Sequence, residues 1–236
     1  HNSEFNELAK MMIVLSLVNA EQTSPINKMT NTYLHFIWDR LRSSANSKAD
    51  FLKSNLTFIT FNYDRAIEYF FKTVIDNFFT SYSEQDKNEM YNSINIFHMY
   101  GGITPHFKMR YDDPSAIKYG EELPYNHDTL MKLKFHSKDI IPLNDFGSYI
   151  NEHRNDFIVN AEVVFILGFG YNPTSFKRLG LDEKNIDCKI YSSCIGLKDY
   201  QLSEIKKITD TFNNVVEINY IPKPIYNILE DHMFVL

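Results

Sequence analysis

The sequence predicts an α/β fold, namely a Rossmann-like, doubly wound and mostly parallel sheet with helices on both faces and an irregular or small helical insertion. Strand-sized apolar runs alternate along the chain with amphipathic helical patterns, as they do in such folds. The run at residues 163–167 is apolar throughout and lacks the alternation of a half-exposed strand. That pattern is typical of a parallel strand with both faces covered.

The composition restricts the class of protein. The chain has 236 residues, of which 44% are hydrophobic and 23% charged, which suits one well-packed domain over residues 1–236. A formal net charge of −6 disfavours a broad nucleic-acid surface. The apolar runs are too short for a transmembrane helix and no secretory signal is visible. We therefore expect a cytoplasmic protein that binds neither nucleic acid directly nor a membrane.

The cysteine content bears on metal binding. The two cysteines, Cys188 and Cys194, form no CxxC pair. A structural zinc site needs about four ligands, usually in closely spaced pairs. We expect no zinc and no other metal.

The first half of the chain predicts two helices, a strand, a helix and a second strand. Apolar residues at helical spacing place the first two helices at residues 4–18 and 28–42, with a break at Ser24-Pro25 between them. The run at 56–61, rich in β-branched and aromatic residues, predicts a buried strand, and the pattern from 64 to 75 predicts a helix. A polar stretch at 83–88 reads as a loop or a short helix. The second strand is expected at 94–100.

The second half predicts further strands alternating with helices. Residues 103–137 contain several Pro, Gly and Asp residues and few long periodic segments, which indicates an irregular insertion or lid. The remaining elements are expected as a helix at 145–159, strands at 163–167, 187–193 and 215–218, and helices at 200–208 and 222–234.

Polar side chains follow the first two predicted strands. Asn62, Tyr63 and Asp64 come directly after the first strand, and His98 lies near the end of the second, before Gly101-Gly102. Ligands of open α/β sheets bind at the carboxyl ends of the strands. Asn62 can hold a ribose or a water, and a histidine with a pKa near neutrality can act as a general base. The structural alternatives are that Asp64 caps the following helix, that Asn62 serves the turn and that His98 is simply packed.

Two later strand ends carry weaker signals. Gly168-Phe169-Gly170 follows the third strand and either admits a nucleotide or makes a tight turn. Tyr191-Ser192-Ser193 ends the next strand, where single hydroxyls are mostly turn formers. The four strand ends together suggest one edge of a sheet that binds a ligand.

These residues resemble the sirtuin-like superfamily, and more closely its bacterial NAD-hydrolysing branch. The segment TFNYD, residues 60–64, is similar to that family's T-x-N-Y/I-D motif. The segment 96–103 is similar to its strand before a His-Gly motif, and 165–170 to its later strand ending in a Gly-x-Ser or Gly-x-Gly turn. The similarity spans roughly residues 56–197.

The resemblance implies hydrolysis of the nicotinamide–ribose bond of NAD, which gives nicotinamide and ADP-ribose. It implies catalytic roles for Asn62, His98 and Asp64, with Asn62 orienting the ribose and water and His98 accepting a proton. The cofactor-binding residues that it implies are Thr60, Tyr63, Tyr100, Gly101, Gly168, Gly170 and Ser192. It further implies a cytoplasmic role in bacterial defence against phage, gated by homo-oligomerisation or by a partner sensor domain.

The chain departs from the family's pattern at three points. Tyr100 stands where the family's histidine directly precedes the glycine, and His98 lies two residues earlier. The chain opens with His1 rather than Met, so we expect that the true N-terminus and the family's glycine-rich nucleotide loop are missing. The absence of zinc cysteines fits the hydrolase branch rather than the protein deacetylases. The alternative is an inactive module that binds NAD, ADP-ribose or a partner, and a scaffold with an empty crevice comes third.

Overall fold

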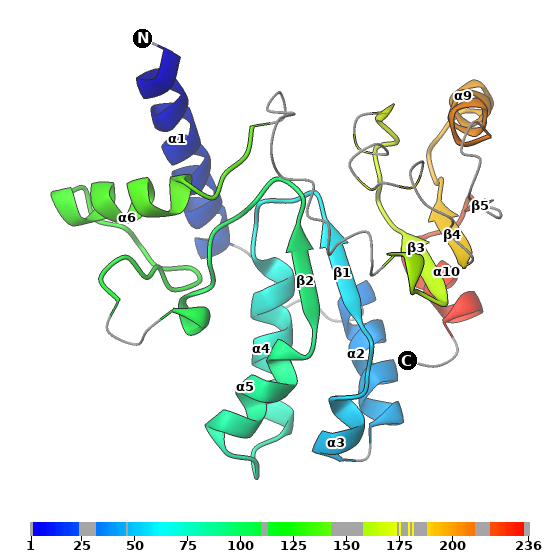
Figure 1. The fold of residues 1–236 in the computed structure, drawn as a ribbon, viewed down its shortest axis with the longest axis horizontal. Coiled ribbons are helices and arrows are strands. Elements are labelled where there is room, and N and C mark those ends of the chain that lie inside the picture. The colour runs from blue at the N-terminus through cyan, green and yellow to red at the C-terminus, as the bar shows by residue number, and fades with distance from the viewer. Residues whose placement is uncertain are drawn as a thin grey trace. The chain divides into compact units, whose positions relative to one another are not determined.

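The computed structural model describes residues 2–23, 32–45, 47–109, 113–142, 158–173, 175, 179, 181, 188–210 and 218–233. The chain divides into two compact units, His1–Gly147 and Ser148–Leu236. Each unit combines helices with a short parallel sheet (Figure 1). The expected mixed α/β class is confirmed, whereas a single domain over residues 1–236 stays a prediction.

The sheet of the first unit has two parallel strands. The strand β1, Thr57–Thr60, pairs with β2, Asn95–His98, so that Thr60 lies opposite His98. The helices α4, Ala66–Phe78, and α5, Glu84–Asn92, form the crossover between them (Figure 1). Because the strands are parallel and in this register, the turns that follow both of them lie at the same edge of the sheet.

The structure shortens one predicted strand in this part of the unit and decides between two alternatives at residues 83–88. The strand predicted at 94–100 ends at His98, because Gly101 has a left-handed φ of +69° that interrupts extended backbone. Tyr100 therefore lies outside the strand. The polar stretch at 83–88 belongs to the helix α5, whose start is fixed by a capping box between Ser83 and Asp86.

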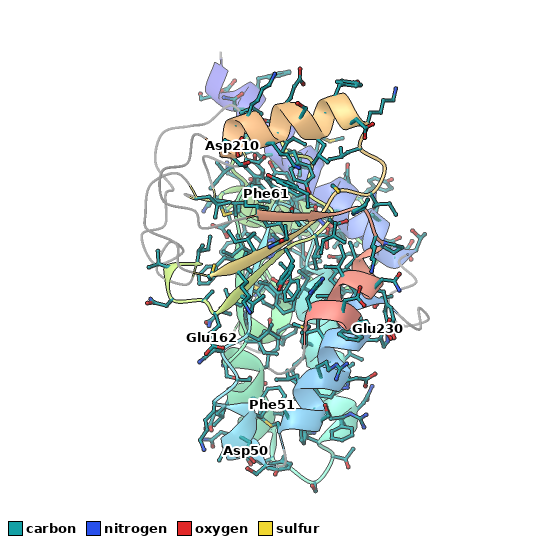
Figure 2. The ribbon with its side chains drawn as sticks, turned by 90° about the vertical axis from the view of Figure 1, so that its right-hand side faces the viewer. Asp50, Phe51, Phe61, Glu162, Asp210 and Glu230 are labelled. Carbon is teal, nitrogen blue, oxygen red and sulfur yellow. The ribbon has the colours of Figure 1, made fainter. Side chains whose placement is uncertain are left out.

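An aromatic cluster joins the helices below the sheet. The helix α2, Tyr33–Ser44, is followed by the short helix α3, Lys48–Phe51. The ring centroids of Trp38, Phe51 and Phe79 lie 5.8 to 6.3 Å from one another in tilted or edge-to-face pairs. Phe51 is completely buried there (Figure 2). Such pairing stabilises the fold beyond the burial of apolar area.

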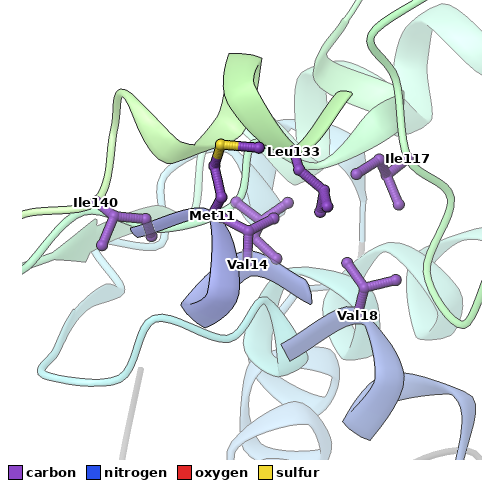
Figure 3. Packing of buried hydrophobic residues seen from close by; sticks show 7 residues of the cluster. Met11, Val14, Val18, Ile117, Leu133 and Ile140 are labelled. Carbon is purple, nitrogen blue, oxygen red and sulfur yellow. The ribbon is translucent and has the colours of Figure 1, made fainter. Parts of the chain in front are cut away.

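The other end of the unit is a packed layer between α1, Asn2–Gln22, and α6, His127–Ser137. The buried side chains come from both helices and from the loops beside α6 (Figure 3): Met11, Val14, Val18, Ile103, Ile117, Leu133 and Ile140. The region predicted as an irregular insertion or lid thus contains a 3₁₀ turn, His106–Lys108, and the helix α6. Within the described residues, no helix has both the length and the apolar character needed to cross a membrane.

The sheet of the second unit has three parallel strands in the order β3-β4-β5, with bounds Val163–Ile166, Lys189–Ser193 and Ile218–Ile221. The helix α9, Asp199–Thr209, forms the crossover from β4 to β5. The helix α10, Ile225–His232, follows Pro224 at its N-cap. In β3 only Ile166 is buried, while Val163 is exposed, so the predicted covering of both faces does not extend along the whole strand.

The boundaries in the second unit differ modestly from those predicted. The last strand runs on to Ile221, and the last helix begins at Ile225 rather than at residue 222. Most of the helix predicted at 145–159 lies outside the described residues, as do residue 187 and residues 215–217. The break predicted at Ser24-Pro25 and residues 28–31 of the second predicted helix also lie outside them.

Candidate functional site

The first feature of the site is an exposed amide at the carboxyl end of β1. The backbone N–H of Asn62 donates to Thr60 Oγ1 at 3.1 Å, which closes a tight turn after the strand. The side chain of Asn62 is exposed and makes no hydrogen bond with a described residue. Thr60 therefore serves the turn, and the Asn62 amide is available to a ligand.

Asp64 lies one residue before the N-cap of the helix α4, which is Arg65, and bonds the first residue of that helix. Its Oδ1 accepts a hydrogen bond from the backbone N–H of Ala66 at 3.0 Å. This bond is close to the structural alternative raised for Asp64 in the sequence, and it accounts for one carboxylate oxygen. Burial and the charge of Asp64 raise the pKa of Tyr33 above its ordinary value.

A buried ion pair anchors the same turn. Arg65 is 2% exposed, and its Nε and Nη2 donate to the two carboxylate oxygens of Glu21 at 2.8 Å each. The same guanidinium also donates to the carbonyls of Ile117 and Lys118 at 2.6 and 3.0 Å. The pair ties the turn after β1 to the end of α1. Sequence reasoning missed it, although an acid at the end of an apolar helix is a usable signal.

His98 lies at the end of β2 with both ring nitrogens engaged. Nδ1 is 2.6 Å from the carbonyl oxygen of Asn62, and Nε2 is 2.7 Å from Oε1 of Glu68. Burial opposes a charged ring, but the hydrogen bond and charge of Glu68, aided by the Asn62 carbonyl, outweigh it and raise the pKa of His98 above its ordinary 6.5. Asp64 adds to this effect. Each ring nitrogen thus lies within hydrogen-bond distance of a protein oxygen atom, and this environment favours the charged form of the ring.

Glu68 is the second functional residue that sequence reasoning missed. It lies on α4 at 4% exposure, and its Oε2 is buried with no hydrogen-bond partner among the described residues. The hydroxyl of Tyr91 on α5 is also buried and unpartnered within that part of the chain. Burial, together with the charge of Glu68, raises the pKa of Tyr91. A carboxylate on the apolar face of a predicted helix was the available signal.

Tyr63 and Tyr100 pack the back of the turn. The hydroxyl of Tyr63 donates to the carbonyl of Ile141 at 2.9 Å. Tyr100 is buried, with its ring centroid 5.8 Å from Phe61 and 5.9 Å from Tyr63. In this structure the two predicted cofactor residues therefore support the turn from within the fold.

The two glycines after β2 allow close packing of the chain on itself. A Cβ at Gly101 would lie 1.6 Å from the carbonyl oxygen of Asp139. A Cβ at Gly102 would lie 3.0 Å from the carbonyl oxygen of Tyr63 and 3.3 Å from Nδ1 of His98. The close approach predicted for Gly101 is thus made by the protein's own backbone.

The remaining predicted residues stand on the second unit. Gly168 has a left-handed φ of +62°, and a Cβ at Gly170 would meet nothing within 4 Å, so this turn borders open space. Ser192 is completely buried, and its hydroxyl lies 2.9 Å from that of Tyr171. The Tyr171 hydroxyl also donates to the carbonyl of Ser193, and burial raises the pKa of Tyr171 to about 12. Ser192 thus bonds within the fold, whereas the glycines stay open to a ligand.

The arrangement favours orientation over proton abstraction. An amide donates and accepts hydrogen bonds but does not titrate, so Asn62 can hold hydroxyls and water. His98 offers no free lone pair in its observed contacts. Among the described residues, no group of three or more His, Cys, Asp or Glu side chains is placed to hold a metal ion. No protein-family model, curated protein or solved structure gives a significant match to this chain.

Proposed function

We propose that this chain is a sirtuin-like domain that hydrolyses NAD at the nicotinamide–ribose bond. The observation that supports it best is the free, exposed amide of Asn62 at the carboxyl end of β1, within a turn fixed by His98 and Arg65. A polar group that is held in place but has no side-chain partner among the described residues suits a ligand rather than the fold. The motif resemblance at residues 60–64 supplies the substrate class.

In the proposed reaction the glycosidic bond breaks and neutral nicotinamide leaves with the bonding electrons. The ribose carbon becomes oxocarbenium-like, a water oxygen bonds to it, and the products are ADP-ribose and one proton released to solvent. The Asn62 amide orients the ribose hydroxyls and the attacking water. In this proposal His98 supports the Asn62 backbone rather than acting as the predicted base, because both of its nitrogens are already engaged with oxygen atoms of the protein.

The predicted Rossmann-like, doubly wound arrangement of the strands is part of the same proposal. A doubly wound sheet would put the carboxyl ends of its strands on one ligand crevice. In the second unit, the open turn at Gly168 and Gly170 suits the close approach of the adenosine half of NAD. We retain the cytoplasmic defence role and the gating by oligomerisation or a sensor domain as further parts of this proposal, since they follow from the resemblance alone.

The test is NAD consumption by the longest form of the protein that can be expressed. We expect Asn62→Ala to lower turnover by about 100-fold or more, since the loss of an orienting group has effects of this order. The matched control is Asn88→Ala, which removes an exposed amide from α5. Circular dichroism of both variants checks that folding is intact. Turnover that survives in Asn62→Ala would reject the site.

The alternative of a binding module has its own support. Tyr100, in the place of the family's histidine, is buried against two aromatic rings, and His98 has no free lone pair in its observed contacts. A pure binder raises its melting temperature with ADP-ribose and converts no NAD. That pair of results in the wild-type protein would favour the module, whereas neither shift nor turnover would favour an empty scaffold.

A further inference from the structure

We propose that Glu68 is a positioning residue of this site: it holds His98 as a doubly hydrogen-bonded imidazolium whose other nitrogen fixes the backbone of Asn62. The effect on turnover rests on the proposed function. The structural part of the proposal, namely the charged pair and the fixed turn, does not depend on the proposed function.

The protonation state follows from the partners of the ring. A carbonyl oxygen can only accept a hydrogen bond, so Nδ1 of His98 must donate to Asn62 across 2.6 Å. In the proposed pair Glu68 is the ionised partner, and because an ionised carboxylate can only accept, Nε2 donates to it across 2.7 Å. A ring that donates from both nitrogens is an imidazolium. Its charge lies against Glu68 of α4, with Asp64 of the preceding turn as the second acid facing it.

The His98–Glu68 pair is largely shielded from solvent, unlike a surface salt bridge. The side chains of His98 and Glu68 are 14% and 5% exposed. Removing one partner of such a pair leaves the other charge without compensation. In this proposal Glu68 does not contact the substrate. It affects the reaction indirectly, because it holds His98, which in turn holds the backbone carbonyl of Asn62.

The ring also has little freedom to leave this position. Gly102 sits so close that a Cβ there would lie 3.3 Å from Nδ1 of His98. Oε2 of Glu68 and the hydroxyl of Tyr91 are both buried without a partner among the described residues, and the charge of Glu68 acts on Tyr91. They can share a water that would complete the hydrogen bonding of the carboxylate. The imidazole is thus held between the turn and α4.

The first experiment measures the ring itself by nitrogen-15 NMR over a pH titration. We expect both nitrogens of His98 to be protonated at pH 7 in the wild-type protein and the ring to become neutral in Glu68→Gln. The control is Asp76→Asn, which removes an exposed carboxylate from the same helix α4 and leaves His98 unchanged. A neutral His98 in the wild-type protein at pH 7 would overturn the proposal.

The second experiment measures positioning. We expect the backbone order parameters of Asn62 and Tyr63 to fall in Glu68→Gln from about 0.85 to below about 0.6. We expect kcat for NAD to fall by about 100-fold with KM nearly unchanged. Wild-type turnover should decline as pH rises through the titration of His98, and this decline should move to lower pH in Glu68→Gln. If His98 were instead a free catalytic base, turnover would rise as pH rises through its titration.

The outcomes separate this proposal from the proposed function. If no form of the protein turns over NAD, the function fails, and Glu68 is judged by the ring protonation and the order parameters alone. If turnover exists but kcat or the order at Asn62 is unchanged in Glu68→Gln, the positioning role is rejected. If Glu68→Gln does not fold, Glu68→Asp takes its place: a ring still charged but a looser turn supports the proposal, and an unchanged turn rejects it.

Discussion

At the scale of single residues, the glycines of two turns have different expected roles. Gly101 is needed for packing, whereas Gly170 is proposed to admit a ligand. Gly101 has a φ of +69°, and a Cβ there would lie 1.6 Å from the carbonyl oxygen of Asp139. Gly101→Ala should lower the free energy of unfolding by at least about 2 kcal/mol, since left-handed backbone alone costs about 1–2 kcal/mol for an L-residue. Urea unfolding measures it. A loss below about 0.5 kcal/mol would contradict both the cost of the left-handed backbone and the clash with Asp139.

For Gly170 we expect a substitution to affect ligand binding rather than stability. A Cβ there would meet nothing within 4 Å, so Gly170→Ala should change the free energy of unfolding by less than about 0.5 kcal/mol. The proposed close approach of a nucleotide would still be obstructed. We expect ADP-ribose binding, measured by calorimetry, to weaken by tenfold or more in this variant. Unchanged binding would remove the Gly168–Gly170 turn from the proposed site.

At the scale of elements, the buried pair of Arg65 and Glu21 connects the turn after β1 to α1. The guanidinium makes four hydrogen bonds, two of them to a carboxylate that is itself buried. Glu21→Gln should therefore cost about 3–5 kcal/mol, because it leaves a buried cation without its counter-charge. The double variant Glu21→Leu, Arg65→Met should recover a large part of this loss in urea unfolding. A double variant no more stable than Glu21→Gln would contradict the account.

The elements also show which part of the structure the sequence could predict. The strands at β1 and β2 were found within two residues because β-branched and aromatic runs stop at polar turns. A small helical insertion was one of the predicted alternatives, but the position of α6 was not predicted. Its apolar residues do not gather on one face: Leu133 is buried while Leu130, Met131 and Phe135 are exposed. Its start depends on a local cap, where Asn126 accepts from the backbone of Thr129 at 2.9 Å.

The candidate site was also only partly predictable from the sequence. Asn62 and Asp64 were identified because they follow a strand directly, and local rules anticipated that Asp64 bonds the start of the following helix, although the N-cap residue itself is Arg65. Glu68 and Arg65 were missed because their partners lie 30 and 44 residues away in the chain. Such long-range pairs have no local pattern. The role of His98 stays a prediction: its residue type alone suggests a base, whereas its two hydrogen-bond contacts are the basis of the proposed support role.

At the scale of the whole molecule, the buried His136 and the mostly buried His98 are expected to give stability an optimum in pH. Burial lowers the pKa of His136 below its ordinary 6.5, although its Nε2 lies 3.0 Å from the carbonyl oxygen of Ser115. The stability that its neutral form provides is full above pH 6.5 and is lost as pH falls through the lowered pKa. The pKa of His98 is raised, so its contribution is full below pH 6.5 and is lost as pH rises through the raised pKa.

We therefore expect the free energy of unfolding to be greatest near pH 6.5 and to fall on both sides by at most about 1.4 kcal/mol per pH unit for each group. Urea unfolding from pH 5 to pH 9 measures the two slopes. Glu68→Gln should flatten the alkaline slope alone, because it removes the partner that keeps His98 charged. His136→Leu should flatten the acid slope alone, even though the lost hydrogen bond lowers stability at every pH. If either variant changed both slopes, the two histidines would be coupled, and their separate assignment to the turn after β1 and to α6 would be wrong.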